Sequence, residues 1–103
     1  MKHFVLSPEA KADLFAHEAN TFANFGYRVA DALIEAFADA FQKLADHPGA
    51  GHVREDLAPT PTEIRFWTVK RRFLIVYRPA PHGIDVVRIF DGSEDVRTKL
   101  QRD

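Results

Sequence analysis

The segment that decides the fold is IRFWTVKRRFLIVYRPAPHGIDVVRIFDGSED, residues 64–95 of the chain. It contains three runs rich in β-branched and aromatic residues, at 64–69, 73–78 and 84–90. Such residues favour the half-buried surface of a β-sheet. Residues 79–83 contain two prolines and a glycine and predict a hairpin loop between the last two runs. We therefore predict three consecutive strands, each lying beside the next.

Two helices are predicted upstream of these strands. Ser7 can cap the free N–H groups of a helix, Pro8 suits its first position, and Glu9 suits the positive end of its dipole. This helix is expected to run to about residue 25, where Gly26 would stop it. A second helix is expected over about 27–46 from an apolar stripe at helical spacing, made of Val29, Leu33, Phe37, Phe41 and Leu44.

The remaining phenylalanines of the two helices, Phe15, Phe22 and Phe25, are most simply expected in the core as well. A short apolar run at residues 3–6 predicts an opening strand, and residues 96–100 a short terminal turn of helix. The resulting order is β-α-α-β-β-β, an α+β fold with a helical hairpin packed on a mostly antiparallel sheet. The position of the opening strand in that sheet is left open.

Composition narrows the functional classes. The 103 residues fit a single domain, 1–103, and 46% of them are hydrophobic, so a packed core needs no disulfide or metal. The chain has no cysteine, shows no signal-peptide pattern and contains no window apolar enough to span a membrane, so a cytoplasmic protein is expected. His47 and His52 flank a glycine-containing loop, but two histidines make a poor metal site, and we expect no metal or other cofactor.

Charge is unevenly distributed although the net charge is only −1. The acidic residues lie mainly on the predicted helices and in the Glu94–Asp95 tail, which makes the sheet end basic. A near-neutral chain does not favour direct nucleic-acid binding, and the basic run 70–72 is more simply a solvated turn. Trp67 is a stacking platform, an interface anchor or, more simply, a core residue. The basic residues of the sheet segment are Arg65, Lys70, Arg71, Arg72, Arg78 and Arg88.

The order of several short motifs resembles the RelE/ParE toxin superfamily, and its ParE branch in particular. LSPEAKADL (6–14) is similar to the family's "LSP-A--DL" opening, and ADHPGAG (45–51) to its "L-x-x-x-P-x-x-G" helix end. REDL (54–57), RFW (65–67) and FLIVYRP (73–79) look like the "R-[DE]-[DE]-L" and "R-F-W…-L-I-x-Y-R" elements. VRIFDGSEDV (87–96) is similar to "V-R-V-L-H-G-x-R-D-[IL]". The resemblance covers nearly the whole chain.

The resemblance implies the toxin of a type II toxin–antitoxin module. ParE-type toxins are understood to poison DNA gyrase, and RelE-type toxins to cleave mRNA on the ribosome with basic residues and a C-terminal Tyr or His. This chain has neither Tyr nor His after His82, so no catalytic residue is assigned and the non-nuclease branch is favoured. The implied partners are a cognate ParD-like antitoxin and DNA gyrase, with no membrane or direct nucleic-acid contact.

Two departures from the family pattern fall in the C-terminal turn. Asp91 stands where the family usually has His, and Glu94 where it usually has Arg. Both make acidic a region that the family ties to toxicity. Alternatives are therefore a RelE-type mRNA interferase, or a degenerate member that binds antitoxin without being toxic. The candidate antitoxin- or target-binding residues are Arg65, Trp67, Arg71, Arg72, Arg78, Arg88, Asp91 and Glu94.

Overall fold

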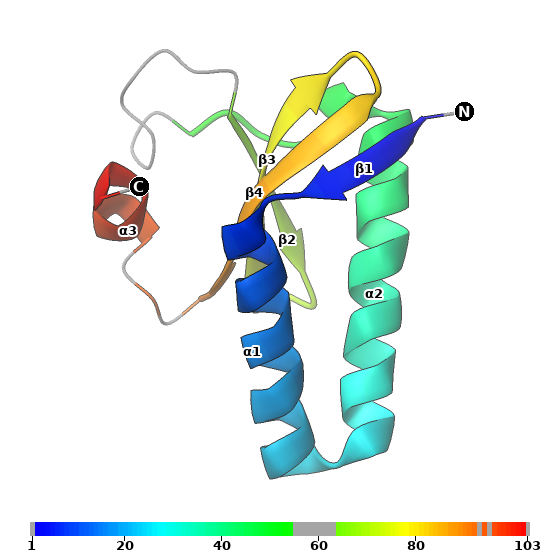
Figure 1. The fold of residues 1–103 in the computed structure, drawn as a ribbon, viewed down its shortest axis with the longest axis vertical. Coiled ribbons are helices and arrows are strands. Elements are labelled where there is room, and N and C mark those ends of the chain that lie inside the picture. The colour runs from blue at the N-terminus through cyan, green and yellow to red at the C-terminus, as the bar shows by residue number, and fades with distance from the viewer. Residues whose placement is uncertain (1, 55–63, 93, 95, 103) are drawn as a thin grey trace.

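The computed structural model describes residues 2–54, 64–92, 94 and 96–102. In these ranges the predicted element order is confirmed (Figure 1). The elements are β1 (His3–Leu6), α1 (Pro8–Phe25), α2 (Tyr27–Asp46), the short 3₁₀ turn η1 (Pro48–Ala50), β2 (Arg65–Val69), β3 (Phe73–Ala80), β4 (Gly83–Asp91) and α3 (Val96–Arg102). Most of the REDL motif lies outside the described residues.

The sheet has the strand order β1-β4-β3-β2. β2, β3 and β4 are antiparallel neighbours, as predicted, and β1 joins the free side of β4 in parallel. The hairpin between β3 and β4 is tighter than expected, because Pro79 and Ala80 pair with Ile84 and Gly83. Pro81 and His82 alone therefore make the turn. The 79–83 loop predicted from the sequence is wrong at both ends.

The helix boundaries follow the local signals. The Ser7 hydroxyl accepts a hydrogen bond from the Ala10 amide at 3.0 Å, which caps α1. Gly26 joins the two helices at φ 85°, a conformation that favours glycine. The two helices form a hairpin whose closed end extends past the sheet (Figure 1).

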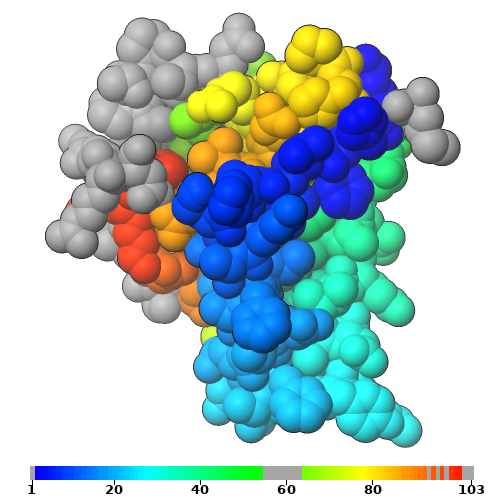
Figure 2. Space-filling view, viewed as in Figure 1, coloured from blue at the N-terminus to red at the C-terminus, as the bar shows by residue number. Residues whose placement is uncertain are grey.

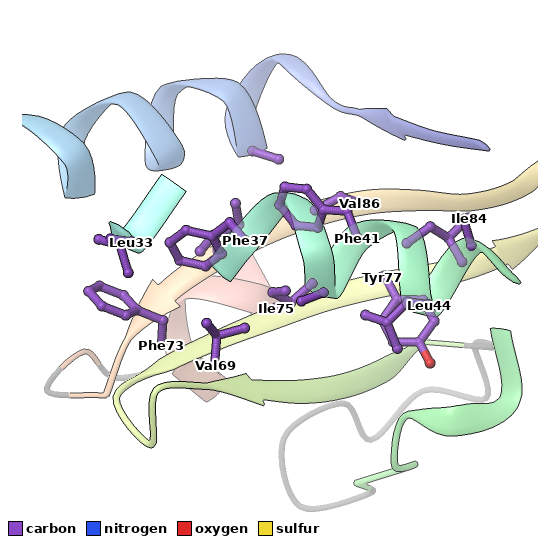
Figure 3. Packing of buried hydrophobic residues seen from close by; sticks show 14 residues of the cluster. Leu33, Phe37, Phe41, Leu44, Val69, Phe73, Ile75, Tyr77, Ile84 and Val86 are labelled. Atoms are coloured by element: carbon purple, nitrogen blue, oxygen red, sulfur yellow. The ribbon is translucent and has the colours of Figure 1, made fainter. Parts of the chain in front are cut away.

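The core lies between this hairpin and one face of the sheet. Leu33, Phe37, Phe41 and Leu44 of the predicted stripe are at most 5% exposed, and they point toward the sheet (Figure 3). Val29 is 47% exposed and lies outside the core. On the opposite face of the sheet, Phe66, Val76 and Phe90 form a second cluster, on which the partly buried Val96 and Leu100 of α3 pack.

Three phenylalanines contradict the expectation that the aromatic residues of both helices are core. Phe15, Phe22 and Phe25 are 72%, 58% and 61% exposed. Phe15 and Phe22 lie on the outer side of α1, whereas Ala10, Leu14 and Thr21 face the core. Phe25 lies on the same side of the helix as Thr21 but at the last position of α1, where the hairpin extends past the sheet. The reason is geometric, because an 18-residue helix with apolar residues on both sides can turn only one side to the sheet.

α1 also completes the free edge of β4. β1 pairs with β4 only as far as Val86, so the backbone groups beyond that point need other partners. The Ser7 hydroxyl donates to the Val87 carbonyl at 2.8 Å. An Asp13 carboxylate oxygen accepts from the Ile89 amide at 2.9 Å, and His17 Nε2 lies 2.9 Å from the Ile89 carbonyl. The N-cap Ser7 and side chains of α1 thus take the place of a neighbouring strand.

Candidate partner-binding surface

The tip of the β2–β3 hairpin presents three consecutive basic residues. The Arg72 amide donates to the Val69 carbonyl at 3.2 Å across the turn, and the two residues between them have positive φ. Lys70 and Arg71 adopt φ values of 56° and 57°, the pattern of a type I′ turn, which usually favours Asn-Gly. Lys70 and Arg71 are exposed, so the turn carries their charges into solvent.

An apolar groove of about 180 Å³ lies between this turn and the closed end of the helical hairpin. Its floor and walls include Phe25, Val29, Leu33 and Phe73, and Lys70 and Arg72 lie at its rim. Phe25 and Val29 are largely exposed, whereas Leu33 and Phe73 belong to the core. An apolar groove with cations along one side suits a partner segment that is apolar on one face and acidic beside it.

The basic residues that the sequence places together do not form one cluster. Lys70–Arg72 occupy the turn that joins β2 to β3, whereas Arg65 and Arg78 lie at the other end of the same two strands. Phe73 and Arg78 are five residues apart on one strand, a separation of about 17 Å. The prediction of a single basic sheet end is therefore wrong, because a hairpin puts the first and last residues of its strands far from its turn.

Two of the candidate residues are partly buried and have neighbours within the chain. Arg65 donates to the Gly51 carbonyl at 2.9 Å. Trp67 packs at the border of the core, where the Lys43 ammonium lies 4.5 Å from the centre of its ring and His52 stacks on it at 6.5 Å. Both side chains therefore hold β2 against the segment that follows α2. Neither side chain is fully available to a binding partner.

Arg88 is held by a carboxylate that the sequence did not point to. Its guanidinium donates two hydrogen bonds to Asp13 of α1, at 2.8 and 3.1 Å, and both side chains are less than one-fifth exposed. This ion pair joins α1 to β4. Arg78 is exposed and lies opposite Asp85 in the sheet register.

The carboxylates of the acidic turn after β4 make hydrogen bonds and ion pairs with neighbouring residues of the chain. Asp91 accepts a hydrogen bond from Arg72 at 3.2 Å. Glu94 accepts from the Asp91 amide at 2.6 Å and forms an ion pair with Lys99 of α3. The two departures from the family pattern therefore close the end of the sheet and join α3 to it. Their carboxylates are compensated locally.

Tyr77 is a buried polar residue that the sequence analysis did not single out as a structural one. Its hydroxyl donates to the Pro48 carbonyl at 2.7 Å and accepts from the Gly51 amide at 2.8 Å. Burial raises the pKa of Tyr77 above its ordinary value of 10.0, and the Gly51 hydrogen bond and the charge of Arg65 oppose that rise. A Cβ at Gly51 would lie 2.3 Å from the Tyr77 hydroxyl, so the contact requires glycine. Tyr77 thus fixes η1 to the sheet.

Sequence reasoning missed Asp13, His17 and the exposed groove residue Val29 as site or framework residues. Asp13 and His17 are four residues apart on one helix face, which was a usable signal, but their partners in β4 are more than 70 residues away.

Among the described residues no group of three or more His, Asp or Glu side chains could hold a metal ion. No helix in the described part of the chain is both long and apolar enough to cross a membrane.

Comparison with models of known protein families identifies one family. Residues 4–96 match the model of the ParE toxin of the type II toxin–antitoxin system parDE. A solved structure from the chromosomal ParDE TA system of P. aeruginosa is similar in fold, with a TM-score of 0.70 over 88% of this chain and 96% of that one. The two sequences are 22% identical, so the likeness extends to the fold alone. No curated protein matches the chain.

Proposed function

The chain belongs to the ParE toxin family, so we propose a mode of action for the toxin component of a type II toxin–antitoxin module. The chain acts by binding a target protein, and a ParD-like antitoxin is its inhibitor. The single observation that carries the proposal is the apolar groove with its basic rim, lined by Phe25, Val29 and Lys70 among others. A ParD-like tail that is disordered when free could order itself in this groove.

The proposal that the chain is not an enzyme is supported by two side chains that a nuclease could use. Both already make hydrogen bonds within the fold. The hydroxyl of Tyr77 is used in two hydrogen bonds inside the fold, and Arg88 is bound to Asp13. The chain has no Tyr or His after His82. Acid–base catalysis on an RNA 2′-hydroxyl needs such a group within reach of the substrate. We therefore propose binding as the mode of action, with DNA gyrase in the cytoplasm as the target that the family suggests.

The target proposal is tested by adding the purified chain to DNA gyrase in a supercoiling assay, with ribosomes and mRNA as the parallel assay. We expect inhibition of gyrase and no cleavage of mRNA. Cleavage that Arg88→Ala abolishes, in a variant that remains folded, would establish the nuclease alternative. Activity in neither assay, together with tight antitoxin binding, would indicate the non-toxic alternative.

The antitoxin proposal is tested by binding kinetics of a ParD-like antitoxin at two ionic strengths. Charge at the rim speeds association and is screened by salt, whereas apolar contacts in the groove set most of the dissociation rate. Arg71→Glu should therefore slow association several-fold at low salt, and Val29→Ser should speed dissociation. Matched controls are Arg78→Glu, the same charge change at the far end of the hairpin, and Val53→Ser, an exposed valine outside the groove. Equal effects of Arg71→Glu and Arg78→Glu would place the tail elsewhere.

A further inference from the structure

The exposed side of α1 is a continuous apolar face. Phe15 and Phe22, 72% and 58% exposed, lie two turns apart along it. Four exposed alanines surround them at helical spacing, namely Ala12, Ala16, Ala19 and Ala23. Figure 2 shows α1 at the front of the molecule with no other element over it. An exposed apolar face of this kind on a helix marks an interaction surface.

The residues of this face repeat with the spacing of a helix-pairing seam. Positions 12, 15, 19 and 22 are separated by three and four residues in alternation, and positions 16 and 23 lie beside them. The opposite side of the helix, with Ala10, Leu14 and Thr21, is already used in packing the core. α1 therefore carries two apolar stripes, one inside the molecule and one outside.

We propose that the outer face of α1 binds the same face of a second copy of this chain, antiparallel and about a two-fold axis. In this arrangement bulky residues meet small ones. With the axis between positions 17 and 18, Phe15 of one copy lies over Ala16, Ala19 and Ala23 of the other. Phe22 of one copy then lies over Ala12 and Ala16 of the other.

Charge does not oppose this pairing. The net charge is −1, so two copies have little overall repulsion to overcome. None of the six seam residues is ionisable. A face made only of alanine and phenylalanine offers no group for a charged partner, which distinguishes it from the basic-rimmed groove. No seam residue lines that groove, so self-association and antitoxin binding use different surfaces.

The contact is expected to be weak. The 18 residues of α1 make a helix about 27 Å long. One pair of helices of that length buries less than the roughly 1,200 Å² at the lower end of stable interfaces. We therefore expect a reversible monomer–dimer equilibrium that depends on concentration in the micromolar range or above, in place of a permanent dimer.

The test is sedimentation equilibrium of the full chain without antitoxin, over a wide concentration range. The variant with Ala16→Glu and Ala19→Glu places carboxylates of the two copies opposite each other and should weaken dimerisation at least tenfold. The variant with Ala16→Lys and Ala19→Lys should do the same. An equimolar mixture of the two should dimerise again, because each acidic pair then faces a basic pair. Restoration by mixing excludes misfolding as the cause of the loss.

A matched control changes the net charge of the other helix by the same amount, by Arg28→Gln and Ala38→Glu, both at exposed positions of α2 that do not line the groove. It should leave the dimer unchanged. The proposal is overturned if the unmodified chain sediments as a monomer at every concentration, if the α2 control disrupts the dimer as strongly as the α1 variants, or if the mixture fails to dimerise. Each of these results is independent of toxicity and of antitoxin binding, so it leaves the proposed function untouched.

Discussion

The ion pair between α1 and β4 gives the sharpest stability prediction. Asp13→Ala removes a carboxylate that accepts two hydrogen bonds from Arg88 and one from the Ile89 amide. The side chains of Asp13 and Arg88 are 17% and 16% exposed, so water does not simply replace the lost partner. The substitution leaves a largely buried guanidinium without its carboxylate and a strand-edge amide without an acceptor.

Breaking a buried pair on one side costs about 3–5 kcal/mol, much of it from the charge that remains. That is a large share of the 5–15 kcal/mol that stabilises a small domain. Asp39→Ala is the matched control, because it removes a carboxylate from an exposed position of α2. It also raises the helix propensity of the site by the same amount as Asp13→Ala does in α1. It should change the free energy of unfolding by less than about 0.5 kcal/mol.

Urea unfolding followed by circular dichroism measures both values and the coupling between the partners. Arg88→Met in the Asp13→Ala background removes the charge that Asp13 had compensated, so the double variant should be more stable than Asp13→Ala alone. If Asp13→Ala costs under about 1 kcal/mol, or if the two changes add without coupling, the ion pair does not hold α1 to the sheet edge and the reasoning fails.

Three further predictions concern the core, the hairpin turn and the buried phenol. Phe37→Ala, which removes a ring that is 1% exposed, should lower the free energy of unfolding in urea by about 3–5 kcal/mol. Phe15→Ala should hardly change the stability of the monomer, and equal losses would mean that Phe15 is buried. Replacing Lys70-Arg71 by Asn-Gly puts residues that tolerate positive φ at both turn positions and should stabilise the fold by about 1–2 kcal/mol. A loss of stability would contradict the assignment of a type I′ turn. Because the pKa of Tyr77 is raised in the fold, its contribution is fully present below pH 10.0 and falls as pH rises from there toward the folded pKa. Tyr77→Phe should be less stable at neutral pH and lose that part of the alkaline dependence, and an unchanged slope in alkaline unfolding curves would refute the assignment.

Local signals were sufficient for most of the fold. The Ser7-Pro8 start and the Gly26 stop define α1 because capping and positive φ depend on adjacent residues. The stripe through Leu33, Phe37, Phe41 and Leu44 predicted the buried face of α2 because charged and amide side chains occupy the opposite side of that helix. The three C-terminal strands and their order followed from alternating β-branched and aromatic runs and from short connections.

The site was less accessible to sequence reasoning. Arg71 and Arg72 were correctly placed on an exposed basic turn, and Arg72 lies at the rim of the groove. Arg65, Arg88, Asp91 and Glu94 were assigned to partner binding, but each has a hydrogen-bond or ion-pair partner within the chain. Residue type alone cannot distinguish a charge offered to a partner from one that already has a neighbour in the fold.

The sequence by itself determined the elements, their order and the family, since these depend on spacing and on motifs along the chain. The tertiary structure decided which of the two apolar sides of α1 lies inside, because only one side can face the sheet. It also placed Asp13 beside Arg88 across 75 residues of chain and separated Arg78 from the Lys70–Arg72 turn. Proximity in a folded chain depends on packing and strand register, and neither is encoded in the spacing of residues along one element.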